Sequence, residues 1–378
     1  MVYSPCGMLS PGTSMSETRI VRAGSLMIGG SWPVSVQTMW KEPLPRCASP
    51  ADPALEPVIR RLASLTDLGC SMVRFAVPDM AAAEALGMLA EKSPLPLVAD
   101  IHFDWRLALR CMDFPIAKIR INPGNIGAAW KVREVAAKAR DRGIPLRIGI
   151  NGGSLPRDLA PVHDRVEAAL AAAEREIELL EAEGFRDIVV SLKMNDPEEV
   201  IRANEAFAAR FPYPLHLGVT EAGPLVAGIV RNTAALVPLL KKGIGATIRV
   251  SLSDSMEHEV IAGREILACA GQGGAGVRIV SCPRCGRASF DTHAFIERWK
   301  NSLYALRVPI TVAVMGCVVN GPGEAREADL GITGAGNAVL IFRQGTIIRR
   351  VHADNADQAF EEALRELVQG NDAARRAD

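Results

Sequence analysis

The C-terminal third of the chain carries the side chains best suited to redox chemistry: three cysteines and one glutamate in two short motifs. Cys282 and Cys285 form a C-x-x-C pair in SCPRCGR, whereas Cys317 and Glu324 lie in MGCVVNGPGE. Three thiolates with one exchangeable carboxylate suit an iron-sulfur cluster whose last iron opens to a substrate. The glycines around Cys317 and Glu324 permit a tight loop whose amides can approach sulfide or substrate oxygen. The two motifs therefore favour a redox-active metal centre.

Two other interpretations of these cysteines stay open. A C-x-x-C pair by itself is more typical of structural zinc or of a thioredoxin-like dithiol. A structural zinc ion takes four Cys or His ligands, and His293 is near enough in the sequence to complete a Cys3His set. The remaining cysteines show no paired spacing and are expected to be ordinary thiols: Cys6, Cys47, Cys70, Cys111 and Cys269.

Length and charge predict a two-domain protein of the cytoplasm. A chain of 378 residues with 48% hydrophobic residues exceeds what one core usually organises. The formal net charge is zero, which argues against a nucleic-acid binder that relies on bulk positive charge. The sequence shows no basic, apolar secretory start and no apolar run of about 18 residues, so we expect no membrane helix. In the cytoplasm the cysteines would be reduced thiols or metal ligands.

A repeated pattern of β-branched run, loop and Ala- and Leu-rich stretch extends from about Ser31 to Ala268. Its predicted strands are 34–39, 71–77, 96–103, 117–124, 146–152, 187–193, 215–221 and 247–253. Strands that alternate with helices form parallel βα units, and eight such units can close a (β/α)8 TIM-type barrel. An open doubly wound sheet is disfavoured because no G-x-G-x-x-G follows the first strand. The fold class is therefore α/β.

Glycine-rich segments divide the chain into three predicted parts. Residues 1–30 end in TRIVRAGSLMIGG, which predicts a hairpin able to plug the bottom of the barrel. Residues 31–269 form the barrel, which is expected to bind the substrate. The segment GQGGAG is then predicted to be a flexible hinge. Residues 270–378 are predicted to form a smaller α+β domain that carries the metal centre.

Five predicted barrel strands carry a cation near the end where catalytic groups of such barrels lie: Arg74, Arg120, Arg147, Lys193 and Arg249. Cations converging on one mouth repel each other strongly unless an anion lies among them. The arginine fork matches phosphate oxygens in pairs, so the expected ligand is a small phosphorylated molecule. In the alternative interpretation, carboxylates such as Asp100 and Glu221 pair with these cations internally.

Other polar residues at the strand ends are less specific. His102 lies two residues after Asp100, so Asp100 could hold its tautomer for proton transfer, although a lone His is more often structural. Asn122 to Asn125 form a turn that could contact phosphate or simply connect a strand to a helix. Four histidines show no partner pattern, and no role is predicted for them: His163, His216, His258 and His352.

These segments together resemble one known family. In order, they are VQTM, VRFAVP, LVADIHFD, RINPGNIG, RIGINGGSL, GVTEAG, RVSLS, SCPRCGR and GCVVNGPGEA. From about Arg19 to Val351 the chain is similar to bacterial 4-hydroxy-3-methylbut-2-en-1-yl diphosphate synthases. The resemblance implies an iron-sulfur oxidoreductase of the methylerythritol phosphate route to isoprenoids. Such enzymes reductively open 2-C-methyl-D-erythritol 2,4-cyclodiphosphate to the linear hydroxymethylbutenyl diphosphate.

The resemblance also implies roles for individual residues. It implies a 4Fe-4S cluster on Cys282, Cys285, Cys317 and Glu324. It implies substrate contacts from Arg74, Asp100, Arg120, Arg147, Asn151, Lys193, Arg249 and Ser251, and catalytic roles for Glu324, Asn320, His102 and Glu221. Glu324 would be an exchangeable ligand or a proton donor, and Asn320 could hydrogen-bond the departing hydroxyl. A flavodoxin or ferredoxin would donate electrons, and a head-to-tail homodimer would place the cluster domain of one subunit over the barrel of the other.

One loop departs from the family pattern. Met39, Trp40, Lys41 and Glu42 replace the family's Met-Thr-Asn-Thr run, and a Pro-rich insert follows through Pro53. This leaves open which substrate contacts the loop makes. Two other functional classes also remain open: a non-redox phosphosubstrate barrel enzyme with structural zinc, and a metal sensor or scaffold. Metal identity and cyclodiphosphate binding discriminate among the three.

Overall fold

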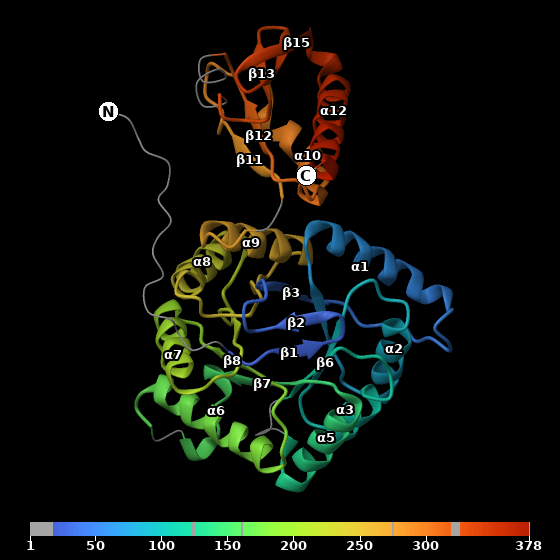
Figure 1. Cartoon of the computed structure of the whole chain (residues 1–378), viewed down its shortest axis with the longest axis vertical. Coiled ribbons are helices and arrows are strands. Elements are labelled where there is room, and N and C mark those ends of the chain that lie inside the picture. The colour runs from blue at the N-terminus through green and yellow to red at the C-terminus, as the bar shows by residue number, and fades with distance from the viewer. Residues whose placement is uncertain (1–17, 122–125, 160–161, 274–275, 319–325, 378) are drawn as a thin grey trace. The chain divides into compact units, whose positions relative to one another are not determined.

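The computed structural model describes residues 18–121, 126–159, 162–273, 276–318 and 326–377. The chain divides into two compact units, Met1–Gln272 and Gly273–Asp378 (Figure 1). Within the described ranges, every helix is too short or too polar to cross a bilayer. Asn122 to Asn125, Asn320 and Glu324 lie outside the described residues.

The first unit is a parallel barrel, as predicted. Its strands are β3 (Ser35–Met39), β4 (Met72–Ala76), β5 (Leu97–Ile101), β6 (Lys118–Ile121), β7 (Leu146–Asn151), β8 (Ile188–Lys193), β9 (His216–Leu217) and β10 (Thr247–Ile248). They are hydrogen-bonded in the order β8-β7-β6-β5-β4-β3-β10-β9. A parallel bridge between Val190 and Leu215 joins the two ends of this sheet, and Val190 N donates to Pro214 O at 3.0 Å. This closure excludes the open doubly wound sheet.

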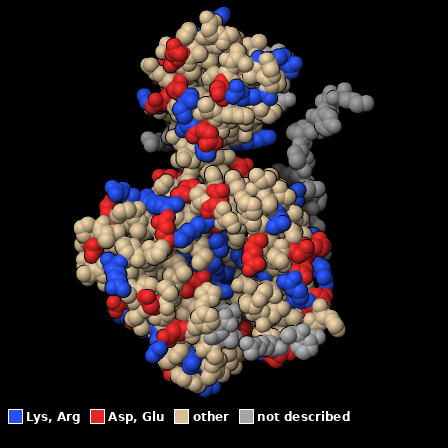
Figure 2. Space-filling view, turned by 180° about the vertical axis from the view of Figure 1, so that it is seen from behind, with Lys and Arg blue, Asp and Glu red and all other residues tan. Residues whose placement is uncertain are grey.

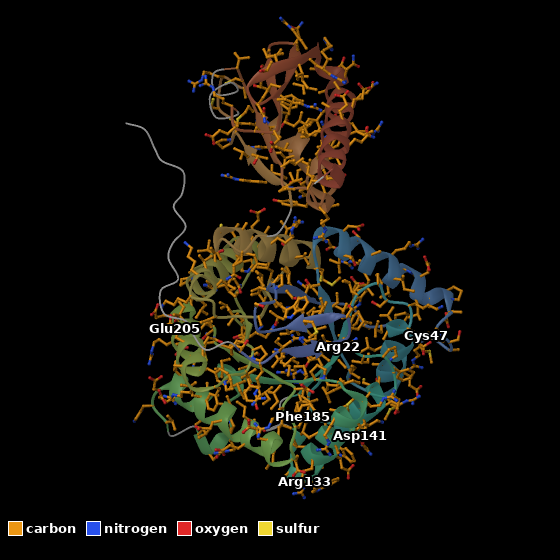
Figure 3. All side chains as sticks on the ribbon, in the orientation of Figure 1. Arg22, Cys47, Arg133, Asp141, Phe185 and Glu205 are labelled. Atoms are coloured by element: carbon orange, nitrogen blue, oxygen red, sulfur yellow. The ribbon has the colours of Figure 1, made fainter. Side chains whose placement is uncertain are left out.

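Helices surround the strands (Figure 1). They are α1 (Glu56–Leu68), α2 (Met80–Ala90), α3 (Trp105–Cys111), α5 (Ala129–Arg142), α6 (Arg165–Ala182), α7 (Pro197–Arg210), α8 (Leu225–Lys241) and α9 (Met256–Cys269). Side-chain oxygens that accept from backbone N–H groups cap five of them: Asp79, Asp104, Asp164, Asp196 and Ser255. In α1, Val58, Leu62, Leu65 and Leu68 recur at helical spacing and are buried. Charged residues such as Arg133 and Glu205 lie at the periphery (Figure 3).

An N-terminal hairpin lies across the barrel (Figure 1). Its strands, β1 (Val21–Ala23) and β2 (Leu26–Ile28), pair antiparallel. The buried hairpin side chains pack with residues at or near the amino ends of barrel strands: Met72, Val98, Val189 and Ala246. The hairpin therefore covers the end of the barrel opposite the carboxyl ends of its strands.

The second unit is a small α+β structure. Its strands are β11 (Arg278–Ser281), β12 (Thr311–Met315), β13 (Leu330–Ala335), β14 (Ala338–Arg343) and β15 (Thr346–His352), in this spatial order. The pairs β11–β12 and β12–β13 are parallel, and the other two are antiparallel. Two helices, α10 (Thr292–Ala305) and α12 (Ala356–Ala377), pack on the sheet through Phe295, Leu303 and Phe360. Among the described residues, short 3-10 turns occur in the first unit at Pro53–Leu55, Gly152–Ser154 and Arg157–Leu159, and in the second unit at Ala353–Asn355.

Candidate active site

The barrel interior carries a concentration of buried cations. Inward-facing positions of a strand recur every second residue, and the structure buries the side chains of Lys118, Arg120, Arg147 and Lys193. TIM-type barrels ordinarily fill this space with branched apolar residues. Blue Lys and Arg atoms gather near the centre of the barrel face that Figure 2 turns toward the viewer. This interior is therefore lined in part by basic side chains, where such barrels ordinarily have apolar ones.

Asp100 is the carboxylate that organises one side of the mouth. Its Oδ1 accepts from Arg120 Nη1 at 2.9 Å, and its Oδ2 lies 3.4 Å from Arg74 Nε. His102 Nε2 lies 3.4 Å from Asp100 Oδ1 and 3.0 Å from Arg120 Nη1. Burial would raise the pKa of Asp100, but Arg74, His102 and Arg120 hold it well below its ordinary value. Internal pairing thus occurs for Arg74 and Arg120, and His102 contacts Asp100, as the spacing of the two residues allowed.

Arg147 and Lys193 have no carboxylate partner among the described residues. Arg147 Nη1 donates to Ser191 Oγ at 2.9 Å, while its Nε and Nη2 are buried without a hydrogen-bond partner. Lys193 Nζ lies 3.1 Å from His216 Nε2. Burial, with added repulsion from neighbouring cations, lowers the pKa of both groups well below the ordinary values. A buried guanidinium with unsatisfied donors is costly unless an anion supplies acceptors.

Two glycines make room for these cations. A Cβ at Gly149 would lie 2.6 Å from Arg120 Nε. A Cβ at Gly218 would lie 2.8 Å from Lys193 Nζ and 2.5 Å from the carbonyl oxygen of Arg249. Any side chain at either position would displace the cation, because real Cβ contacts are not this short. Glycine at these two positions therefore leaves the space that the side chains of Arg120 and Lys193 occupy.

Asn151 and Glu221 meet at a second part of the mouth. Both line a cavity of about 180 Å³ together with Gly153, Ser154, Arg165, Asn195 and Thr220. Glu221 adopts a left-handed backbone with φ of 51°. This conformation is rare for a residue with a side chain, and such residues cluster at functional sites. Ser251 is half-buried just after Arg249, in the loop that follows β10.

The loop that departs from the family pattern lines a larger cavity. This cavity of about 580 Å³ is bordered by Met39 to Arg46, by the start of α2 and by Arg249. Trp40 is buried and stacks on Phe75 with ring centroids 5.3 Å apart. Arg74 Nη2 contacts Met39 Sδ at 2.9 Å. The loop is thus part of the wall of the mouth.

The cysteines of the second unit lie at the carboxyl ends of two neighbouring strands. Cys282 follows β11, Cys317 lies shortly after β12, and Cys282 N donates to Val314 O at 2.9 Å. A Cβ at Gly316 would lie 3.7 Å from Cys282 Sγ, which places that sulfur beside the residue preceding Cys317. All three motif cysteines are free thiols and at least partly exposed.

The described residues do not assemble a complete metal-ligand set. No group of three or more His, Cys, Asp or Glu within the described ranges could hold a metal ion. This applies to the three cysteines alone and to the Cys3His set with His293. Glu324 and Asn320, the other predicted members of this site, fall in the undescribed segment 319–325.

Comparison with known proteins decides the family. A sequence model of the GcpE TIM-barrel domain matches residues 18–264, and a model of the GcpE protein C-terminal domain matches residues 278–366. The chain belongs to the GcpE family. The protein named 4-hydroxy-3-methylbut-2-en-1-yl diphosphate synthase (flavodoxin) in Treponema pallidum is 53% identical over 364 residues, which cover 91% of this chain and 89% of that protein.

A second relative and a solved structure extend the comparison. The protein of the same name in Treponema denticola is 49% identical to this GcpE-family chain over 373 residues, which cover 90% of this chain and 95% of that protein. Among solved structures, Yersinia pestis dihydropteroate synthase is 13% identical with a TM-score of 0.48, covering 67% of this chain and 97% of that chain.

Two interior residues of the GcpE-family barrel were not predicted to have a role. His216 is fully buried, and its Nδ1 lies 2.7 Å from Thr247 Oγ1 while its Nε2 faces Lys193. Lys118 is also fully buried, and its Nζ contacts Met72 Sδ at 3.3 Å. Lys118 precedes Arg120 by two residues, so strand periodicity was a usable signal for its inward direction. For His216, the only sequence signal of an interior side chain was its position within a predicted strand.

Replacing Lys118 by methionine should stabilise the ligand-free protein. Lys118→Met removes a buried charge that has no carboxylate partner within the described ranges, so we expect the free energy of unfolding to rise by roughly 1 to 3 kcal/mol at neutral pH. Burial, then Arg147 and Arg74, lower the pKa of Lys118 well below 10.5. The unfolded chain therefore binds more protons between the two pKa values, and the wild-type protein gains stability as pH rises through that window.

The advantage of the methionine variant should consequently be largest at neutral pH and below, and should disappear above about pH 10.5. Denaturant unfolding of both proteins across this pH range measures it. A methionine variant less stable than wild type at neutral pH would show that Lys118 stabilises the fold.

Proposed function

We propose that this GcpE-family chain is a 4-hydroxy-3-methylbut-2-en-1-yl diphosphate synthase. It converts 2-C-methyl-D-erythritol 2,4-cyclodiphosphate to 4-hydroxy-3-methylbut-2-en-1-yl diphosphate in isoprenoid precursor biosynthesis. The reaction consumes two electrons and two protons. It opens the cyclic diphosphate at a carbon-oxygen bond and releases a hydroxyl as water. The observation that carries the proposal is the pair of buried, carboxylate-free cations Arg147 and Lys193 inside the mouth. The relatives named above carry this activity in their names.

The barrel residues would bind and orient the diphosphate. Arg147 and Lys193 would neutralise it, and Arg249, Asn151 and Ser251 would contact its oxygens from neighbouring loops. These groups are held in place before the substrate arrives, so little reorganisation is needed as negative charge develops on the departing diphosphate oxygen. The existing pairs of Arg74 and Arg120 with Asp100 keep those guanidinium groups oriented.

Protons would come from groups at the rim. His102 is half-exposed and contacts both Asp100 and Arg120, so it can exchange protons with solvent while its orientation is fixed. Glu221 lies at the cavity that Asn151 also lines. Glu324 and Asn320 are proposed partners of the departing hydroxyl on the resemblance alone, with Glu324 as exchangeable ligand or proton donor.

We propose a 4Fe-4S cluster held by Cys282, Cys285, Cys317 and Glu324. The support is the chemistry of the donor set, because Cys282, Cys285 and Cys317 are free, accessible thiols near the ends of two neighbouring strands in a chain of the GcpE family. When bound, such a cluster supplies electrons one at a time. The names of the relatives specify flavodoxin, so we propose flavodoxin as the donor, with ferredoxin as the other carrier class.

We further propose a head-to-tail homodimer in which the cluster unit of one copy covers the barrel mouth of another. Large apolar side chains are exposed in segments that follow barrel strands at the mouth side: Met80, Phe103, Trp130, Val162, Val226 and Val230. Phe103 is 74% exposed and Val226 is 76% exposed. Exposed apolar side chains in several of these segments would be covered by such an interface.

Turnover tests the proposed function. Protein prepared without oxygen and reconstituted with iron and sulfide is mixed with the cyclodiphosphate and a reduced donor, and the product is identified by mass spectrometry. We expect the linear diphosphate to form only when the reductant is present. Fully loaded protein that binds the cyclodiphosphate but forms no linear product would contradict the proposal. No feature of the described residues favours the non-redox enzyme with structural zinc.

A further inference from the structure

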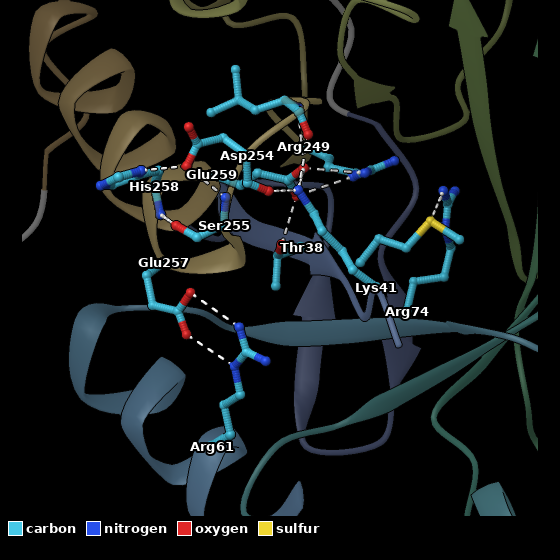
Figure 4. A network of polar contacts seen from close by, with 12 residues as sticks. Thr38, Lys41, Arg61, Arg74, Arg249, Asp254, Ser255, Glu257, His258 and Glu259 are labelled. Atoms are coloured by element: carbon cyan, nitrogen blue, oxygen red, sulfur yellow. Dashed lines mark hydrogen bonds and ion pairs between the residues drawn. The ribbon is translucent and has the colours of Figure 1, made fainter. Parts of the chain in front are cut away.

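Glu259 is a buried carboxylate on which four groups around the mouth converge. It lies in the first turn of α9, and its side chain is fully inaccessible to solvent. Its Oε2 accepts from Thr38 Oγ1 at 2.6 Å, and its Oε1 accepts from Leu252 N at 3.1 Å. Lys41 Nζ lies 3.1 Å from the same Oε1. Figure 4 shows Thr38, Lys41 and Arg249 arranged around the carboxylate.

Arg249 meets Glu259 through one edge of its guanidinium. Nε lies 3.4 Å from Oε2 and Nη2 lies 3.3 Å from Oε1, a side-on, two-point contact. The remaining nitrogen, Nη1, has no acceptor among the described residues. Arg249 also borders the cavity that the loop after β3 lines. The contact with Glu259 therefore determines which edge of Arg249 remains available for a ligand.

Lys41 connects the divergent loop to the same carboxylate. Besides Glu259, its ammonium donates to the backbone oxygens of Leu252, at 2.9 Å, and of Asp254. Because three protein acceptors surround the ammonium of Lys41, its hydrogen-bonding capacity is satisfied within the protein. It links the loop after β3 to the loop after β10, and these two strands are neighbours in the barrel. The loop that departs from the family pattern is thus fixed at Glu259.

We propose that Glu259 is a positioning residue for diphosphate binding, which holds Arg249 so that its free edge faces the ligand. Thr38 and Leu252 N fix the carboxylate, the carboxylate fixes the guanidinium, and Lys41 fixes the loop beside it. This inference rests on the proposed function, because it assigns a role in binding the diphosphate of that same site.

A competing role for Glu259 makes the opposite prediction. If the carboxylate only neutralised Arg249, its removal would leave extra positive charge at the mouth, and an anion would bind more tightly. If it positions Arg249, its removal frees the guanidinium to adopt other rotamers, and the anion binds more weakly despite the gain in positive charge. The direction of the change in affinity therefore distinguishes the two roles.

The test measures binding of inorganic pyrophosphate and of the cyclodiphosphate by titration calorimetry. We expect Glu259→Gln to weaken binding of both by at least about tenfold and to raise KM more than it lowers kcat. Unchanged or tighter binding of pyrophosphate would overturn the inference. In an Arg249→Ala background, Glu259→Gln should have little further effect, since both changes remove the same contact.

Two further variants control for folding. Glu257 lies in the same turn of α9, and its carboxylate pairs with Arg61 at 3.1 Å. Glu257→Gln removes this carboxylate and should leave pyrophosphate affinity unchanged. Thr38→Val removes one hydrogen bond to Glu259 without changing charge, and it should weaken pyrophosphate binding about threefold even if Glu259→Gln fails to fold. Unchanged affinity in folded Thr38→Val would contradict the inference.

Failure of the inference and failure of the proposed function are distinguishable. Wild-type protein that binds pyrophosphate and turns over the cyclodiphosphate, with an unaffected Glu259→Gln variant, overturns only the positioning role. Wild-type protein that binds neither anion overturns both.

Discussion

Cys317→Ser is expected to abolish iron binding and turnover while the barrel still binds the cyclodiphosphate. A serine hydroxyl does not ionise near neutral pH and is a poor ligand for the iron of a cluster that cysteine thiolates hold. Cys317 lies just after β12, outside the barrel unit, so its loss should leave Arg147 and Lys193 undisturbed. Iron and sulfide analysis, turnover and calorimetric substrate binding together measure the three expectations.

Cys269→Ser is the matched control for this variant. Cys269 ends α9 and is an exposed free thiol outside both cysteine motifs. Its replacement should leave iron content and turnover at the wild-type level. Full turnover in iron-free Cys317→Ser protein would refute the proposed role of the cysteines, whereas loss of iron in both variants would indicate a general loss of folding.

Arg147→Ala should have the complementary effect: normal iron content and severely weakened substrate binding. Arg147 is buried, has two unpartnered guanidinium nitrogens and lacks a carboxylate partner in the described part of the chain. Charge-assisted hydrogen bonds to phosphate in a site that excludes water are strong, so we expect affinity to fall on the order of 100-fold. The melting temperature should not fall markedly, because the variant also removes an unpaired buried charge.

Arg133→Ala is the control for Arg147→Ala. Arg133 lies on the outside of α5 (Figure 3) and forms an exposed ion pair with Glu183 at 3.9 Å. Such pairs contribute little, so affinity and turnover should match wild type. Substrate affinity that is unchanged in Arg147→Ala would place the diphosphate elsewhere and contradict the proposed site.

The barrel could be predicted because short apolar runs, most of them with β-branched residues, alternate along the chain with loops and with Ala- and Leu-rich helical stretches. Parallel βα topology then brings all the strand ends to one mouth, which makes neighbours of residues as distant in the sequence as Arg74 and Arg249. The sequence also indicated that Asp100 would interact with His102, because the two are separated by one strand period.

The carboxylate partner of Arg249 could not be predicted from strand positions. Glu259 lies on a helix, and nothing in its local sequence indicates that it turns inward to accept from Thr38 and Arg249. Its burial depends on the crossing of α9 over β3 and β10, which is a tertiary property. From the sequence alone, Lys41 would be expected to be an exposed loop residue. In the structure its ammonium instead lies between two loops.

The identity of the bound metal tests the central claim most directly, since the account requires the three motif cysteines to serve redox chemistry. Iron, acid-labile sulfide and zinc per chain should be measured on protein purified without oxygen. We expect about four iron and four sulfide per chain, with little zinc. About one zinc per chain with no sulfide would contradict the account, because the cysteines would then be a structural site and the barrel would lack its source of electrons.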